Sequence, residues 1–79
     1  MTYTLYTLPA CCRCPAVKNY LETTSLKGKV LDAVQNMDDC RRLNINSTPT
    51  VVFYGNDGFN EIGREFDITG VKKFIQNHS

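Results

Sequence analysis

Three cysteines occur within four positions of this chain, Cys11, Cys12 and Cys14. Such a cluster of thiols can bind a metal, staple the chain or exchange disulfides. Cys11 and Cys14 are three residues apart, so on a first helical turn they share a face, with the Cα separation of about 4.4 to 6.8 Å that a disulfide needs. Cys12 is turned roughly 100° away from Cys11. The spacing therefore lets Cys11 and Cys14 close a disulfide without backbone movement and leaves Cys12 a bystander.

The chemistry of this pair depends on a thiolate. A free thiol has a pKa of about 8.5 and is mostly protonated at neutral pH. The unpaired N–H groups of a helix start carry about half a positive charge, and Arg13 adds a full one. We expect both to lower the pKa of Cys11, which would attack a substrate disulfide before Cys14 resolves the mixed disulfide. Pro15 favours a later helix start, which would move Cys14 toward the cap position and weaken the shared face.

Strand-like and helix-like patterns alternate in the first half of the chain. Tyr and Thr around Leu suit a pleated strand, and a helical apolar period follows the cysteines. A later apolar run is typical of a strand buried on both faces. The predicted elements are a strand over residues 3–8, a helix that ends at Ser25 and Gly28, and a strand over residues 30–34. Together they form a βαβ crossover, which must be right-handed.

The second half predicts a helix, a hairpin and a final helix. Asn36 can cap a short helix whose acidic residues come first and whose basic residues come last. The turn Gly55-Asn56-Asp57-Gly58 joins two strands, and Asp67 can cap a last amphipathic helix. The short helix covers residues 37–43, and the two strands cover residues 50–54 and 59–62. The last helix has Ile68, Val71, Phe74 and Ile75 on one face.

The order βαβαββα predicts an α/β fold, a four-stranded mixed sheet flanked by three helices on two faces. The cysteine loop then lies at the carboxyl end of the first strand and at the amino end of the first helix, where α/β sheets expose reactive groups. A length of 79 residues and a hydrophobic content of 42% fit one globular domain over residues 1–79.

The charge and composition of the chain limit the classes of molecule that it can bind. A formal net charge of +1 offers no broad field for phosphate backbones or acidic membranes. We find no charged leader and no apolar run near the ~20 residues of a membrane span. Three of the four cysteines crowd one corner, where they would cross-link little of a secreted domain. We therefore expect a cytoplasmic protein, a monomer, that binds neither nucleic acid nor membrane.

Thr48 and Pro49 stand at the start of the third predicted strand. Proline has no N–H for a sheet ladder, so it leaves the backbone groups of the preceding residue free to pair with another chain. On the residues alone a trans bond is expected, because only about 5 to 6% of X-Pro bonds in folded proteins are cis. Arg13 and Arg64 are candidate substrate contacts, with solvated surface charge as the alternative for each.

Taken together, these segments resemble the thioredoxin and glutaredoxin superfamily over essentially the whole chain. LYTLPACCRC resembles the glutaredoxin pattern IYSKPGCPYC and, more closely, the pattern IYTKPACVQC of NrdH-type redoxins. STPTVVFYGNDG resembles the thioredoxin segment GIPTLLLFKNGE. The resemblance implies the thioredoxin fold, Cys11 as the attacking and Cys14 as the resolving cysteine, a cis Pro49, and backbone pairing of Thr48 with substrate.

The resemblance also implies an activity, the reduction of protein disulfides, with the redox-active Cys11–Cys14 disulfide and no bound cofactor. It suggests ribonucleotide reductase as one client, and a thioredoxin reductase-like enzyme or the glutathione system as the electron source. Leu8 stands where glutaredoxins carry a lysine that helps to hold glutathione, and IGREFD replaces their second glutathione segment. These departures favour protein disulfides over glutathione mixed disulfides.

A thiolate metal carrier and a non-enzymatic binding module of the same fold remain alternatives. A closed zinc site needs four ligands, and only Cys40 or His78 could add the fourth. Small copper chaperones also place a C-x-x-C motif after a first strand, but they end in a strand, so a helix after Asp67 discriminates. We expect Cys40 to pack as a small hydrophobe beside Met37 and Leu43, and His78 to fray.

Overall fold

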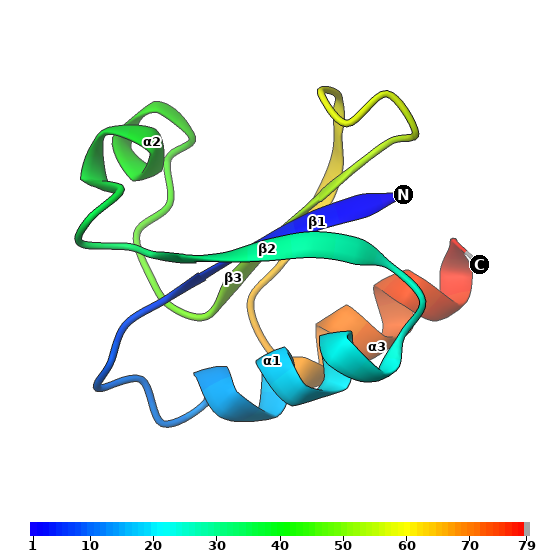
Figure 1. Cartoon of the computed structure of the whole chain (residues 1–79), viewed down its shortest axis with the longest axis horizontal. Helices are drawn as coiled ribbons and strands as arrows, with labels where there is room; N and C mark the ends of the chain where they lie inside the picture. The colour runs from blue at the N-terminus through cyan, green and yellow to red at the C-terminus, as the bar shows by residue number, and fades with distance from the viewer. Residues whose placement is uncertain (79) are drawn as a thin grey trace.

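A computed structural model of the chain describes residues 1–78, which form one mixed sheet and three helices (Figure 1). Its strands lie in the order β2-β1-β3-β4, with β1 parallel to β2 and antiparallel to β3, and β3 antiparallel to β4. The elements are β1 (Thr2–Thr7), α1 (Cys14–Thr23), β2 (Lys27–Asp32), α2 (Met37–Arg42), β3 (Thr50–Tyr54), β4 (Glu61–Glu65) and α3 (Ile68–Asn77). The predicted fold class is confirmed.

Helices cover both faces of the sheet, but unequally. In Figure 1, α1 and α3 lie side by side below the sheet, whereas α2 lies above one end of it. Successive side chains of β1 point to opposite faces of the sheet, so Leu5 packs toward α1 and α3 whereas Tyr6 packs toward α2. The core below the sheet consists of Tyr3, Leu5, Val17, Leu21, Val51, Phe53 and Val71, and the smaller core above it of Tyr6, Cys40, Ile45 and Val52.

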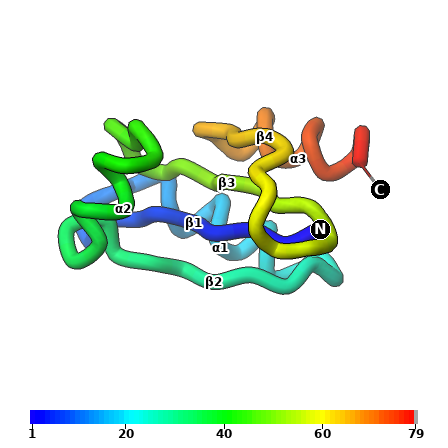
Figure 2. The backbone as a smooth tube through the Cα atoms, turned by 90° about the horizontal axis from the view of Figure 1, so that it is seen from above, coloured from blue at the N-terminus to red at the C-terminus, as the bar shows by residue number. Residues whose placement is uncertain are grey.

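The second strand differs from the prediction of a strand buried on both faces. β2 spans Lys27–Asp32 and forms one edge of the sheet, as Figure 2 shows from above, and Val30 is 42% exposed. Val34 lies beyond the strand, because Oδ1 of Asp32 accepts hydrogen bonds from the N–H groups of Val34 and Gln35 and closes a turn there. The apolar run therefore belongs partly to an edge strand and partly to the turn that follows it.

The strand that returns from the hairpin also begins later than predicted. It starts at Glu61, whereas the prediction placed Phe59 in it. Oδ1 of Asp57 accepts hydrogen bonds from the N–H groups of Phe59 at 3.0 Å and Asn60 at 3.1 Å, which keeps both residues in the turn. The turn is thus longer than its glycines alone indicated.

The two predicted helix caps have different outcomes. Asp67 caps α3 as predicted, with its Oδ1 accepting the N–H of Gly70 at 2.7 Å. Asn36 precedes α2 but its side chain makes no cap. Its Nδ2 instead donates to the carbonyl of Asp32 at 2.8 Å, within the turn that ends β2. Asn36 therefore shapes the approach to α2 and not its first turn.

Aromatic rings hold the end of α3 against the sheet. Phe74 stacks on Phe53 with ring centroids 4.2 Å apart, and its ring covers Gly63 so closely that a Cβ there would overlap it. His78 stacks on the other side of Phe74 at 4.0 Å, and its Nδ1 lies 2.8 Å from the Phe74 carbonyl oxygen. The expectation that His78 frays is wrong, because the ring of Phe74 provides a surface for it.

Candidate active site

Cys11 and Cys14 are joined by a disulfide between the end of β1 and the start of α1. Their Cα atoms are 5.5 Å apart, within the range expected from the spacing. The helix begins at Cys14, which is the later start that Pro15 favoured, so Cys11 lies before the helix and the two cysteines do not share a helical face. The bond closes because a turn, in which the N–H of Cys11 donates to the carbonyl of Leu8 at 3.1 Å, leads Cys11 back to the helix start.

The two sulfur atoms have different surroundings. Cys14 is buried, with 4% of its surface exposed, whereas Cys11 is partly exposed. The backbone N–H of Cys14 donates a hydrogen bond to Sγ of Cys11 at 3.2 Å. Near a helix start such an N–H group has no acceptor within the helix. The exposed sulfur therefore lies at the positive end of α1, where negative charge is stabilised.

Two cations lie close to the cysteines in the chain, Arg13 just before α1 and Lys18 within it. Arg13 occupies the position before the helix, is exposed, and makes no side-chain cap. Lys18 lines a depression of about 290 Å³ together with Cys11 and Cys14. Lys18 was not among the predicted site residues, although its position four residues after Cys14 places it on the same side of the helix. Both cations can favour a thiolate in this loop.

Thr48 and Pro49 lie at the same end of the sheet as the disulfide, because the end of β1 meets the start of the antiparallel strand β3. Their peptide bond is cis, as the resemblance implied. Thr48 and Leu8 line a groove of about 430 Å³. The other apolar residues of its wall are Ala33, Val34, Met37, Cys40 and Ile45. The cysteine loop and the backbone of Thr48 therefore border a mainly apolar surface.

Arg64 has a different environment from the other predicted substrate contacts. Its Nε and Nη2 donate to the carboxylate of Glu61 at 2.7 Å each, and its Nη1 donates to the carbonyl of Leu43 at 2.7 Å. The hydrogen bond to Arg64 lowers the pKa of Glu61, and the same bond raises the pKa of Arg64. Arg64 thus ties β4 to the end of α2 rather than joining the group around the disulfide.

The remaining cysteines are separate thiols. Cys12 is exposed, and Cys40 is buried with its Sγ 3.8 Å from the carbonyl oxygen of Ala33. Burial raises the pKa of the Cys40 thiol, and the nearby charge of Asp39 raises it further. The prediction that Cys40 packs in the core is confirmed.

Residues 1–78 contain neither a cluster of metal-binding side chains nor a helix that could span a membrane. None of their His, Cys, Asp and Glu side chains gather in groups of three or more that could hold a metal ion. None of the helices in this part of the chain has the length and apolar character needed to cross a membrane.

The chain was compared with known families, sequences and structures. No family model and no curated protein sequence matches it. Thioredoxin 1 from Thermosipho africanus superimposes with a TM-score of 0.80 and 21% identity, over 99% of this chain and 93% of that one. Thioredoxin from Fasciola hepatica gives 0.81 and 20% over 99% and 80%, and oxidised thioredoxin from Plasmodium falciparum gives 0.78 and 17% over 98% and 79%. These similarities show that the chain has the thioredoxin fold.

Proposed function

We propose that this protein is a thiol-disulfide oxidoreductase that reduces protein disulfides through Cys11 and Cys14. The observation that carries the proposal is the asymmetric disulfide at the start of α1, with one sulfur partly exposed beside a helix N–H group and the other buried. A structural staple across a four-residue loop would constrain little of the chain. A reactive pair needs this asymmetry, because one sulfur must be accessible to the substrate disulfide and the other must be protected until it resolves the mixed disulfide.

The reduced protein would act in two exchange steps. The thiolate of Cys11 attacks one sulfur of the substrate disulfide, and the other substrate sulfur leaves as a thiolate that takes up a proton. The thiolate of Cys14, formed by loss of its proton, then attacks Sγ of Cys11 and expels the second substrate sulfur, which is protonated in turn. Two electrons pass from the protein to the substrate, and the Cys11–Cys14 disulfide remains.

The surface around the loop that carries Cys11 is suited to an extended polypeptide substrate. An extended segment could pair with the backbone of Thr48 and place an apolar side chain in the groove beside Leu8. Arg13 stands on the exposed rim of the loop, where it could meet an acidic group of the substrate. Leu8 offers no charge for the carboxylate of glutathione, so we place protein disulfides first.

The partners follow from the same proposal. A thioredoxin reductase-like enzyme or the glutathione system would return two electrons to the Cys11–Cys14 disulfide, and ribonucleotide reductase is one candidate client. A reducing, cytoplasmic environment suits a donor of this kind. Turnover with NADPH and thioredoxin reductase, compared with glutathione and glutathione reductase, distinguishes the two electron sources.

Cysteine variants test the mechanism in insulin reduction with dithiothreitol. Cys11→Ser should be inactive, because it removes the attacking sulfur. Reduced Cys14→Ser, freed of dithiothreitol and mixed with substrate, should accumulate a covalent adduct that added dithiothreitol then releases, because the mixed disulfide cannot be resolved. Cys12→Ser is the matched control and should keep its turnover.

Two results would contradict the proposal. Retained turnover in Cys11→Ser would mean that another group attacks. Near-stoichiometric zinc or copper in protein purified under reducing conditions, together with no insulin reduction, would favour a metal carrier instead.

A further inference from the structure

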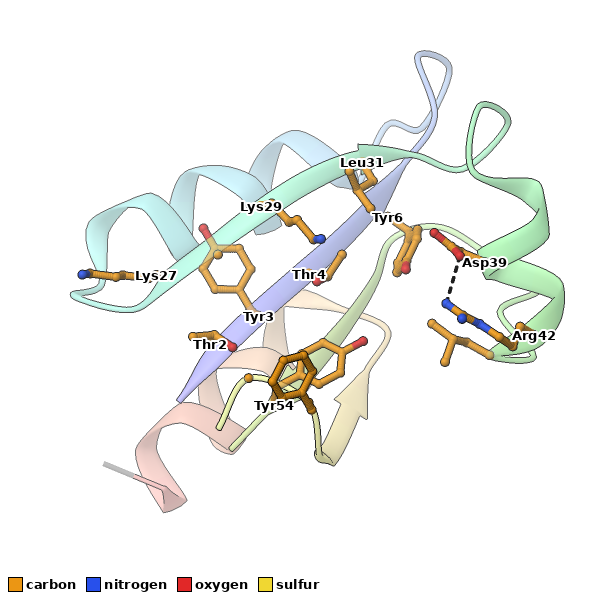
Figure 3. A pocket seen from close by; sticks show the side chains of 14 residues that line it. Thr2, Tyr3, Thr4, Tyr6, Lys27, Lys29, Leu31, Asp39, Arg42 and Tyr54 are labelled. Atoms are coloured by element: carbon orange, nitrogen blue, oxygen red, sulfur yellow. Dashed lines mark hydrogen bonds and ion pairs between the residues drawn. The ribbon is translucent and has the colours of Figure 1, made fainter. Parts of the chain in front are cut away.

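The face of the sheet above β1 is open between α2 and the hairpin turn, which stand at its two ends (Figure 1). A groove of about 790 Å³ lies between them, with the sheet as its floor (Figure 3). It is separate from the cysteine loop, which borders other depressions. Residues that matter for its chemistry are Tyr6, Lys27, Lys29, Leu31, Asp39 and Arg42.

The charges along this groove are unbalanced. Lys27 and Lys29 contribute two positive charges from β2, and neither makes an ion pair with any of residues 1–78. Arg42 adds a third positive charge from α2. Asp39 is the one carboxylate among the lining residues, and Arg42 already binds it at 2.9 Å, as Figure 3 shows. A ligand that complements the groove must therefore carry negative charge on the side of β2.

The strand that carries these lysines is also an edge. β2 pairs with β1 on one side only, and no strand of residues 1–78 lies on its other side. Lys27 and Lys29 are aligned with Thr2 and Thr4 of β1, so their side chains stand on the groove face of the sheet. The outer backbone groups of β2 are therefore open to another chain beside the row of positive charge.

We propose that an extended acidic segment of a partner protein adds to the sheet as a fifth strand along β2. Side chains of neighbouring strands face one another about 5 Å apart, and alternate residues share a face. Acidic residues at two alternate positions of the partner would then face Lys27 and Lys29. An apolar residue two positions further on would lie against Leu31 and the ring of Tyr6, which border the groove.

A second copy of this chain fits the edge less well. Two β2 strands side by side would bring lysine against lysine, a device that blocks edge pairing in natural sheets. The other edge strand, β4, carries Glu61 and Glu65, but Arg64 binds the Glu61 carboxylate through two nitrogen atoms, which leaves Glu65 alone to face two lysines. A strand from a different, acidic protein is therefore the occupant that the charges favour. The interaction does not depend on the redox function proposed above.

A short labelled peptide tests the proposal on the full-length protein. A fluorescein-labelled peptide Thr-Glu-Thr-Glu-Thr-Val-Thr places both glutamates and the valine on one face, and its binding is followed by fluorescence anisotropy at low and high salt. We expect saturable binding that weakens with salt, and no binding of the peptide in which lysine replaces glutamate. Hydrogen exchange should show slower exchange of backbone amides within residues 27–32 in the complex.

Matched variants locate the surface. Lys27→Glu/Lys29→Glu should weaken binding about tenfold, because two attractive cross-strand pairs become repulsive. Lys72→Glu/Lys73→Glu makes the same charge change on α3, across the sheet from the groove, and should bind like the unchanged protein. Both variants alter exposed side chains, and circular dichroism verifies that they fold. Insulin reduction by Lys27→Glu/Lys29→Glu should be unchanged, which separates this surface from the cysteine chemistry.

Any one of four results from the binding and exchange experiments overturns the proposal. These are no binding at millimolar peptide, equal binding of the glutamate and lysine peptides, equal loss of binding in the two double variants, and amide protection confined to residues outside β2. Sedimentation of the free protein as a dimer that Lys27→Glu/Lys29→Glu dissociates would also overturn it, in favour of a second copy on this edge.

Discussion

The backbone N–H of Cys14 donates a hydrogen bond to Sγ of Cys11 across 3.2 Å, and the two residues form the disulfide. The donor belongs to the first residue of α1, so it carries the partial positive charge of a helix start. When the disulfide is reduced, the same N–H group is in place to stabilise a thiolate on Cys11. Under the proposed function, this hydrogen bond favours Cys11 over Cys14 as the nucleophile.

The first prediction is that Cys11 ionises more readily than an ordinary thiol. In reduced Cys12→Ser protein, the rate of alkylation by iodoacetamide should follow the thiolate of Cys11, with a midpoint below the pKa of about 8.5 of a free cysteine. Cys14 should be alkylated more slowly than Cys11, because it is buried. An alkylation midpoint at or above that of glutathione, measured in parallel, would contradict this assignment.

Lys18 supplies the second prediction. Its side chain lines the depression that contains both cysteines, so Lys18→Glu replaces attraction for a thiolate with repulsion. We expect alkylation of Cys11 at pH 7 to slow by about two- to fivefold, and more at low salt than at high salt. Lys73→Glu on α3 is the matched control. Equal rates for the two variants would show that Lys18 lies too far from the sulfur to act on it.

The third prediction concerns the two cysteines outside the disulfide. In the oxidised protein, Cys12 should react with a thiol reagent within seconds, because it is exposed. Cys40 should react only as fast as the protein opens, because its thiol is buried and its pKa is raised. Mass spectrometry of the labelled peptides distinguishes the two sites, and urea should equalise their rates. Fast labelling of Cys40 without denaturant would mean that the small core above the sheet opens readily.

Arg64 gives a prediction about stability. Its side chain is 25% exposed and binds both Glu61 and the carbonyl of Leu43. Arg64→Met should lower the free energy of unfolding by roughly 1 to 3 kcal/mol, mainly because it leaves the partly buried carbonyl of Leu43 without a donor, whereas water can replace Arg64 at the exposed Glu61 carboxylate. Urea denaturation measures this loss. If instead stability is unchanged and kcat/KM for an acidic protein substrate falls, Arg64 acts on substrate, as its position in the sequence first suggested.

The ion pair also predicts a dependence on pH. Because Arg64 lowers the pKa of Glu61 in the folded protein, folding favours the carboxylate. The resulting stabilisation is present above the unfolded pKa of about 4.3 and is lost as the pH falls through the lower pKa of the folded state. Between pH 6 and pH 3 the unfolding midpoint in urea should therefore fall further for the unchanged protein than for Glu61→Gln. Parallel decreases would show that the pair does not couple to folding.

Local patterns in the sequence predicted the cap of α3 but not that of α2. The cap at Asp67 was predictable because an N-cap depends on residues within one turn of it. The extent of β2 was not predictable, because it depends on pairing with β1, from which α1 separates it in the sequence. Val30 and Val34 have the same apolar character, yet the turn at Asp32 separates them. An apolar run therefore indicated a strand without indicating its bounds.

The candidate site shows the same division. The spacing of Cys11 and Cys14 was sufficient to predict a disulfide, and the resemblance gave the cis bond before Pro49. The sequence did not reveal that Arg64 meets Leu43, because that contact depends on the register of β4 against β3 and on the path of the loop after α2. Lys18 differs from Arg64, because its place one helical turn after Cys14 can be read directly from the sequence.

The hydrogen bond to Cys11 has a consequence for variation of this protein. Its donor is main chain, so replacing a neighbouring side chain does not remove it, and only a change in the course of the polypeptide would do so. The residues at positions 12 and 13 are both exposed and make no such bond. They can therefore vary without loss of this bond, and the part of the sulfur's environment that the main chain supplies is inherited with the backbone.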